Sequence, residues 1–272
     1  MDLTATFERL SREPDAPLDL ATIALYLAKE EFPDLDVDSY LRQLDQWAEA
    51  LGPGLEDCTL EEQYDRLCTL LFEKAGFHGN QEDYYNPNNS YLNQVIDRRT
   101  GLPIALAAVA MAVGKRAGLQ VIGIGLPGHF LAQIHDGFGS ILFDPYHGGK
   151  RLRVADCTEL VERATGAPAF LTPMHFEPVS LQAMLVRMLG NLRGVYMEQE
   201  DHHRAIRILQ RLRQLQPDQA VFHRDLGISH LKTGQPGLAV SHLSVYLKTE
   251  PADAEAVHPL LAQAHRALAP WN

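Results

Sequence analysis

The last third of the chain repeats itself every 34 residues, which restricts this part to a stack of similar helical units. Four pairs of identical residues lie 34 positions apart: Leu192 and Leu226, Ala205 and Ala239, Leu209 and Leu243, Pro217 and Pro251. Tyr196 and His230 form a further equivalent pair. Because one such unit cannot bury its apolar face alone, neighbouring units must cover it. The pattern therefore predicts an all-α domain over residues 179–272.

The period and the residue types of this tail resemble the tetratricopeptide repeat. In that repeat small alanines lie where two helices touch, and a proline follows the second helix. The resemblance predicts repeats at about 186–219 and 220–253 and a closing helix at 254–269. Arg193 stands where the second unit has Gly227, so the first unit is the weaker match. Repeats of this kind imply that at least part of the chain binds a protein partner or braces the rest of the molecule.

Charge and cysteine content exclude several classes of partner and site. The formal net charge of −11 argues against a nucleic-acid surface, which needs clustered lysine and arginine. The cysteines, Cys58, Cys68 and Cys157, are odd in number and widely spaced, so they predict neither a disulfide framework nor a zinc pattern. Residues 1–15 lack the apolar segment of a signal peptide, and the longest apolar run, 101–114, is too short to cross a bilayer. We expect a cytoplasmic protein with no membrane partner, cofactor or metal.

The first two thirds of the chain predict an α+β domain. Residues 18–75 carry apolar side chains at helical spacing, and Gly76 is a plausible helix end. A polar, asparagine-rich loop occupies residues 77–92, and an apolar helix opens at Gly101-Leu102-Pro103. Short strands follow at 119–126, 130–134 and 141–143, and a helix and a proline-containing linker fill 150–180. We expect residues 1–76 to form the helical part of this domain and residues 77–178 to form its core.

A hairpin argument brings His129 and Asp144 together. With a two-residue turn at Asp136-Gly137, residues whose numbers sum to 273 lie opposite each other, and His129 and Asp144 are such a pair. A four-residue loop makes them diagonal neighbours on one face, whereas a three-residue loop places them on opposite faces. A carboxylate beside an imidazole orients the ring and fixes its tautomer. Such a pair is the base and the orienting group of a nucleophilic triad.

Four segments together resemble the SirB family, which joins a transglutaminase-like core, related to the papain-type cysteine proteases, to tetratricopeptide repeats. The segments are Asn89-Ser90-Tyr91-Leu92, Arg98-Arg99-Thr100-Gly101-Leu102-Pro103-Ile104, Pro127-Gly128-His129-Phe130 and Asp144-Pro145-Tyr146-His147-Gly148-Gly149. The resemblance covers nearly the whole chain. It implies that His129 and Asp144 correspond to the histidine and aspartate of a transglutaminase-like site. It also places the transglutaminase cysteine near Pro103, Ile104 and Ala105, where this sequence has no thiol or hydroxyl.

Other side chains are weaker candidates for a nucleophile or a binding group. Cys68 lies on an apolar helix face and is expected to be a small core residue. Ser90 offers a hydroxyl, but its asparagine-rich surroundings favour a turn or capping role. Asn89 is expected either to line the cleft and donate a hydrogen bond to an oxyanion or to hold the loop through an Asx-turn. The histidines near the pair, His135 and His147, show no spacing typical of a metal site.

Two hypotheses follow from these residues. In the first, the core keeps the fold of an enzyme without its nucleophile, and the repeats bind a protein partner, with regulation as one role that such binding can have. In the alternative, the protein is a hydrolase or acyl-transfer enzyme in which His129 acts as a general base on water and Asp144 orients it. The missing thiol and the repeat tail favour the first hypothesis.

Overall fold

The computed structural model describes residues 1–269, and the chain divides into two compact units. We call residues 15–188, together with Met1, the core unit, and residues 2–14 together with the chain from Leu189 onward the repeat unit. Helix α1 (Leu3–Arg12) therefore belongs with the repeats, whereas the sequence assigned residues 1–76 to the core. The reason is side-chain packing: Phe7 is fully buried under the guanidinium of Arg211, which also donates to the hydroxyl of Thr4 at 3.0 Å.

Three α-helices occupy the predicted helical region of the core unit. They are α2 (Leu20–Lys29), α3 (Val37–Ala50) and α4 (Leu60–Cys68), and a π-helical turn, η1 (Thr69–Lys74), continues α4. Side chains of Asp19, Asp36 and Thr59 accept hydrogen bonds from the first-turn N–H groups of these helices, which fixes where each begins. Gly76 has φ of +76° and ends the helical region as the sequence predicted.

The main sheet has four antiparallel strands in the order β3-β4-β5-β6. Three strands were predicted and are observed: β3 (Gln120–Leu126), β4 (His129–His135) and β5 (Ser140–Asp144). The short strand β6 (Lys150–Leu152) was not predicted, because three residues carry too little alternation to be recognised. A separate parallel pair of two-residue strands, β1 (His78–Gly79) and β2 (Thr100–Gly101), joins the two ends of the asparagine-rich region. That region also holds a single 3-10 turn, η2 (Pro87–Asn89), and helix α5 (Leu92–Arg98).

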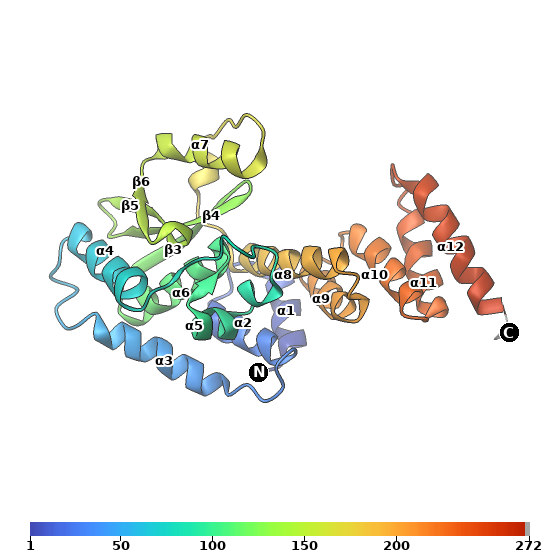
Figure 1. Cartoon of the computed structure of the whole chain (residues 1–272), viewed down its shortest axis with the longest axis horizontal. Helices are drawn as coiled ribbons and strands as arrows, with labels where there is room; N and C mark the ends of the chain where they lie inside the picture. Colours follow the sequence, from blue (N-terminus) through green and yellow to red (C-terminus); the bar gives the residue numbers. More distant parts are fainter. Residues whose placement is uncertain (270–272) are drawn as a thin grey trace. The chain divides into compact units, whose positions relative to one another are not determined.

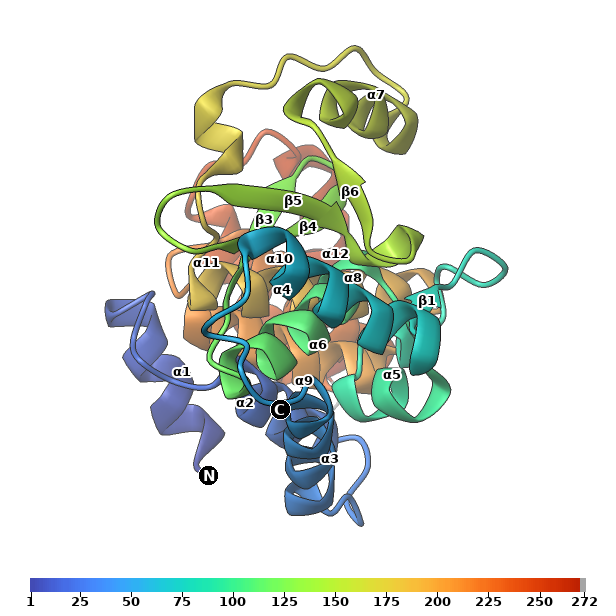
Figure 2. The ribbon, with the colours of Figure 1, turned by 90° about the vertical axis from the view of Figure 1, so that its left-hand side faces the viewer.

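Helices cover both faces of this sheet. Helix α6 (Pro103–Arg116) lies against one face and α7 (Val154–Thr165) against the other (Figures 1 and 2). Gly114 of α6 permits the close approach of this helix to strand β3, because a Cβ at position 114 would lie 2.5 Å from the side chain of Val121. Under α7, Cys157, Leu160 and Val161 pack on the apolar side chains of the strands. A 3-10 turn, η4 (Pro173–Phe176), lies in the linker beyond α7. The observed architecture is the predicted α+β class.

The repeat unit contains the predicted helical pairs. Besides α1, it contains the C-terminal half of α8 (Leu181–Glu198) and the helices α9 (His202–Leu215), α10 (Val221–Lys232), α11 (Pro236–Leu247) and α12 (Ala254–Leu268) (Figure 1). Gly227 allows α10 to approach α11, since a Cβ there would lie 2.5 Å from Leu243. At the equivalent place the first unit has Arg193 instead of glycine, and its partly exposed guanidinium pairs with the buried carboxylate of Asp225 in the second unit. Residues 270–272, at the end of the predicted repeat domain, lie outside the described residues.

No helix between residues 1 and 269 combines the length and the apolar character that a bilayer-spanning segment requires.

Candidate functional site

The hairpin formed by β4 and β5 brings His129 and Asp144 onto one face of the sheet. Its register pairs Ala132 with Phe143 and His135 with Ser140, so residues 136–139 form a four-residue loop. The carboxylate of Asp136 closes this loop by accepting from the N–H groups at 138 and 139, at 2.9 and 2.8 Å. Of the three hairpins considered from the sequence, the structure has the four-residue loop. His129 and Asp144 are therefore diagonal neighbours.

The carboxylate of Asp144 lies between two imidazoles. Its Oδ2 is 2.9 Å from Nε2 of His129 and 2.7 Å from Nδ1 of His147. Its Oδ1 accepts from the N–H groups of Tyr146 and His147, at 2.9 and 3.3 Å. Burial alone would raise the pKa of Asp144, but the hydrogen bonds and charges of His129 and then His147 outweigh it and hold the pKa below its ordinary value.

Sequence reasoning missed His147 as a member of this group. It follows Asp144 by three residues, and the single 3-10 turn η3 (Pro145–His147) returns its ring to the carboxylate. Residues three apart eclipse each other in a 3-10 turn. Pro145, directly after Asp144, was the sequence signal that could have indicated this turn, because proline suits the first position of a helical turn.

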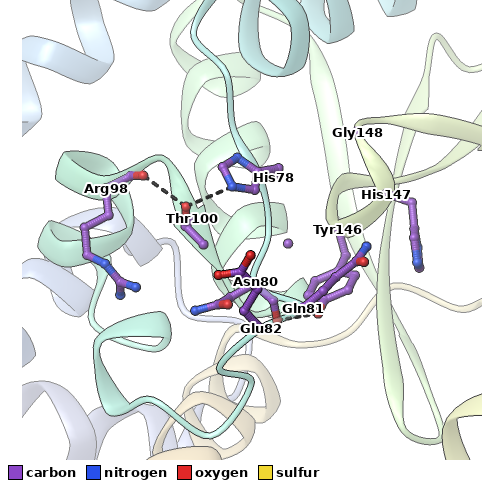
Figure 3. A pocket seen from close by; sticks show the side chains of 10 residues that line it. His78, Asn80, Gln81, Glu82, Arg98, Thr100, Tyr146, His147 and Gly148 are labelled. Atoms are coloured by element: carbon purple, nitrogen blue, oxygen red, sulfur yellow. Dashed lines mark hydrogen bonds between the residues drawn. The ribbon is translucent and has the colours of Figure 1, made fainter.

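Three cavities meet at His147. The first, of about 650 Å³, is lined by both imidazoles together with Pro103, Tyr84, Tyr85 and Tyr146. The second, of about 720 Å³, lies on the other side of Tyr146, with His78, Arg98 and Thr100 across from it (Figure 3). The third, of about 480 Å³, reaches Asp144 itself and is lined by Lys150 and Arg153. The buried pair is thus connected to solvent through openings that share the half-exposed ring of His147.

The residues predicted to replace the nucleophile lie at the start of α6. Pro103 lines the cavity beside His129, whereas Ile104 and Ala105 are buried and do not line it. The residues described around this cavity include no cysteine, serine or threonine. The site therefore combines the oriented imidazole of His129 with the side chain of Pro103, which has no nucleophilic atom.

The cysteines lie outside this cavity, and two of them are hard to ionise. Burial raises the pKa of the Cys68 thiol to about 12 and that of Cys157 to about 11. Cys68 lies beside the carbonyl of Gly149, Cys157 lies on the face of α7 that packs on the sheet, and the thiol of Cys58 donates to the carbonyl of Gly54 at 3.2 Å. A reactive cysteine has the opposite property, a lowered pKa in a partly exposed place.

Asn89 and Ser90 do not line the cavity at His129. The amide of Asn89 is fully buried, donates to the carbonyls of Asp83 and Tyr84 at 2.7 and 3.1 Å, and accepts from the amide of Asn80 at 3.0 Å. These bonds hold the asparagine-rich loop, but they run to residues 80–84 and do not form the Asx-turn that was the structural alternative considered for Asn89. Tyr84, which Asn89 contacts, lines the cavity. The buried hydroxyl of Ser90 has no hydrogen-bond partner among the described residues.

Arg187 was not predicted from the sequence and holds the turn before His129. Its guanidinium donates to the carbonyl of Leu126 at 3.0 Å and to that of His129 at 2.6 Å, so it spans the Pro127-Gly128 turn. It also lies over the ring of Phe130, 5.2 Å from the centroid. Burial lowers the pKa of this guanidinium from its ordinary value. The contact is long-range, so no local pattern reveals it.

Comparison with known proteins agrees with this architecture. Residues 38–190 match the family model of the transglutaminase-like superfamily, and residues 192–265 match a tetratricopeptide repeat model. A UPF0162 protein of Xylella fastidiosa is 35% identical over 92% of the chain and 90% of its own length. A UPF0162 protein of Pseudomonas aeruginosa is 30% identical over 80% of the chain and 79% of its own length. F-box only protein 21 of Mus musculus is 32% identical over 47% of the chain and 21% of its own length. No solved structure matches the chain.

The transglutaminase-like model matches more than half of the chain, the repeat model matches the part that follows, and a UPF0162 protein aligns over 90% of its own length. The chain therefore belongs to the transglutaminase-like superfamily and to the UPF0162 family of proteins.

Proposed function

We propose that the chain is a cytoplasmic protein-interaction factor of the SirB family, in which the repeats bind a protein partner and the core does not perform thiol acyl transfer. The observation that carries the proposal is the proline at position 103, which lines the cavity beside His129 where a thiol enzyme needs its nucleophile. Because no cysteine among the described residues lines the cavity at His129, the repeats are the recognised binding module that remains. We propose repeat boundaries of 186–219 and 220–253, with the closing helix at 254–269.

Charge and cysteine state support the rest of this proposal. The net charge of −11 disfavours nucleic acid as the partner. Cys58, Cys68 and Cys157 are free thiols, as is usual in a reducing compartment.

Site-specific photo-crosslinking in the full chain tests the interaction. Gly194 on α8 is exposed, and a Cβ added there has nothing within 4 Å, so position 194 has open space for the first atom of a benzoylphenylalanine side chain. Phe138 at the tip of the β4–β5 hairpin is fully exposed and provides a matched position in the core unit. We expect a protein adduct in cells from position 194 and none from position 138. An adduct from 138 alone, or none from 194, contradicts the proposal.

A second candidate function is hydrolysis or acyl transfer without a cysteine, in which His129 removes a proton from water and Asp144 orients the ring. The 2.9 Å hydrogen bond between them, beside a cavity of about 650 Å³, favours it. The test is His129→Ala in the full chain, assayed for hydrolysis and transamidation of amide and ester substrates. Rates equal to wild type, both at background, rule this candidate out.

A further inference from the structure

Two imidazole nitrogens and one carboxylate oxygen converge beside the cavity at Pro103. Nε2 of His129, Oδ2 of Asp144 and Nδ1 of His147 all lie within 4.8 Å of one another. They come from a strand end and a 3-10 turn, so the convergence is a product of the hairpin rather than of local sequence spacing. We propose that these three side chains bind a divalent transition-metal ion of the zinc type. This inference goes beyond the proposed interaction function.

The charge balance of the site favours a cation. Asp144 is 1% exposed, and its ion-pair partners within the described residues are the two imidazoles alone, with no lysine or arginine. A buried carboxylate is costly unless a positive charge compensates it. The nearby guanidiniums are already engaged: that of Arg153 pairs with Asp156 at 3.0 Å and that of Arg163 with Glu159 at 3.8 Å. The two imidazoles orient the carboxylate, and a divalent ion bound among the three side chains would add a fixed positive charge beside it.

The distances are compatible with such an ion after a small displacement. Bonds of about 2.0–2.1 Å in tetrahedral geometry place ligand atoms about 3.3 Å apart. Oδ2 is now 2.9 Å from one imidazole nitrogen and 2.7 Å from the other, so each separation must open by roughly half an ångström. The side chain of His147 is 43% exposed and can rotate away from Oδ2. The separation between His129 and Asp144, whose main chains are held by the sheet, opens through a small rotation of one of these two side chains about its own bonds.

The second oxygen of the carboxylate already has the support that metal-binding carboxylates receive. Oδ1 of Asp144 accepts from two consecutive N–H groups of the 3-10 turn, which fixes the plane of the carboxylate and leaves Oδ2 directed at the imidazoles. The main chain of His129 is fixed in the same way by Arg187, which donates to its carbonyl at 2.6 Å. Two of the three ligands are thus preorganised.

The donor set indicates the kind of ion and leaves a position free. Two imidazoles and one carboxylate suit zinc, iron(II), cobalt(II) or nickel(II), whereas magnesium and calcium prefer oxygen ligands alone. Three protein ligands with a fourth position open to solvent are typical of catalytic rather than structural zinc sites. Both imidazoles line the cavity that Pro103 and Tyr84 also line, so this cavity could admit a water molecule as the fourth ligand.

Direct metal binding by the full chain tests the inference. The chain is treated with chelator, and binding of Zn²⁺ is measured by calorimetry, with Mg²⁺ as a competitor. We expect one Zn²⁺ per chain, no displacement by Mg²⁺, and an affinity at least about 100-fold weaker in His147→Ala, since even loss of an outer-shell partner costs 10–100-fold. His135→Ala is the matched control, because His135 lies at the far end of the same strand as His129 and outside the cluster. It should bind Zn²⁺ as wild type does.

Cobalt(II) provides a readout on wild-type protein if His147→Ala fails to fold. Paramagnetic Co²⁺ should broaden the ring-proton NMR signals of His129 and His147 at stoichiometric amounts, before those of His135 are affected. No Zn²⁺ binding by wild type, equal binding by His147→Ala, or Co²⁺ broadening that spares both His129 and His147 overturns the inference. These readouts do not depend on any activity, or on whether the repeats bind a partner.

Discussion

A cysteine placed at position 103 should become an activated thiol. Pro103 is the first residue of α6 and lines the same cavity as His129. A thiol there lies at a helix N-terminus and beside an imidazole, the two features that lower a cysteine pKa to between about 3.5 and 7.5. Proline at this helical position makes no intrahelical N–H bond, so its replacement costs the helix little.

The size of the effect follows from thiolate fractions. A free cysteine with a pKa of about 8.5 is about 3% thiolate at pH 7, and a pKa of about 7 raises this to about half, roughly a 15-fold increase. The native background is small: with pKa values of about 12 and about 11, Cys68 and Cys157 are about 0.001% and about 0.01% ionised at pH 7. A Cys58→Ser change removes the remaining native thiol, which is partly exposed.

The assay is the rate of alkylation by iodoacetamide between pH 5 and 9, on chelator-treated Pro103→Cys/Cys58→Ser protein. We expect the midpoint of the rate profile to fall at or below about pH 7.5. Adding His129→Ala should move the midpoint upward, because the imidazole is then lost while the helix N-terminus remains. A midpoint near 8.5, or one that His129→Ala leaves unchanged, would refute the placement of position 103 beside an activating histidine.

Three further predictions concern the two units separately. Gly227→Ala should lower the stability of the repeat unit by about 1–3 kcal/mol, because its Cβ would lie 2.5 Å from Leu243; urea unfolding measures this, and Leu243→Ala in the same chain should relieve part of the loss. The folded pKa of Asp144 is below the unfolded value of about 3.9, so Asp144 contributes stability above that pH, and this stability is lost as pH falls through the folded pKa. Asp144→Asn should therefore unfold more easily at pH 7, and its stability should decline less steeply with acid below about pH 4. An equally steep decline in Asp144→Asn and wild type would contradict this. Burial, and then the neighbouring His223 and His230, lower the pKa of His242 to about 4. The neutral His242 ring therefore contributes stability above about pH 6.5, and this contribution declines as pH falls towards 4. NMR titration of His242 should give a midpoint near 4, and His242→Asn should weaken the pH dependence of stability between about pH 7 and 5.

Local patterns were sufficient for much of the fold. The apolar helix opening at Pro103, the helix end at Gly76 and the repeated alanines and prolines of the tail all lie in the predicted elements. Each depends on interactions between residues close in sequence, such as helix periodicity, turn chemistry and capping. The short strand β6 escaped prediction because its stability comes from pairing with β5.

The candidate site was only partly predictable, for a related reason. The hairpin argument left three possible placements of His129 relative to Asp144, one for each loop length. The observed four-residue loop is what decides among them. His147 joins them through a single 3-10 turn that has no periodicity to detect. Arg187 reaches the carbonyl of His129 from 58 residues away.

The sequence by itself determined the class of the fold, the helical repeats and the lack of a thiol or hydroxyl near Pro103, because these follow from residue identity and from neighbours a few positions away. Only the tertiary structure decided that α1 packs with the repeats, that Pro103 faces the same cavity as His129, and that two imidazoles share the buried carboxylate of Asp144. These features depend on which distant segments the hydrophobic core brings together. Residue spacing along the chain does not record that information.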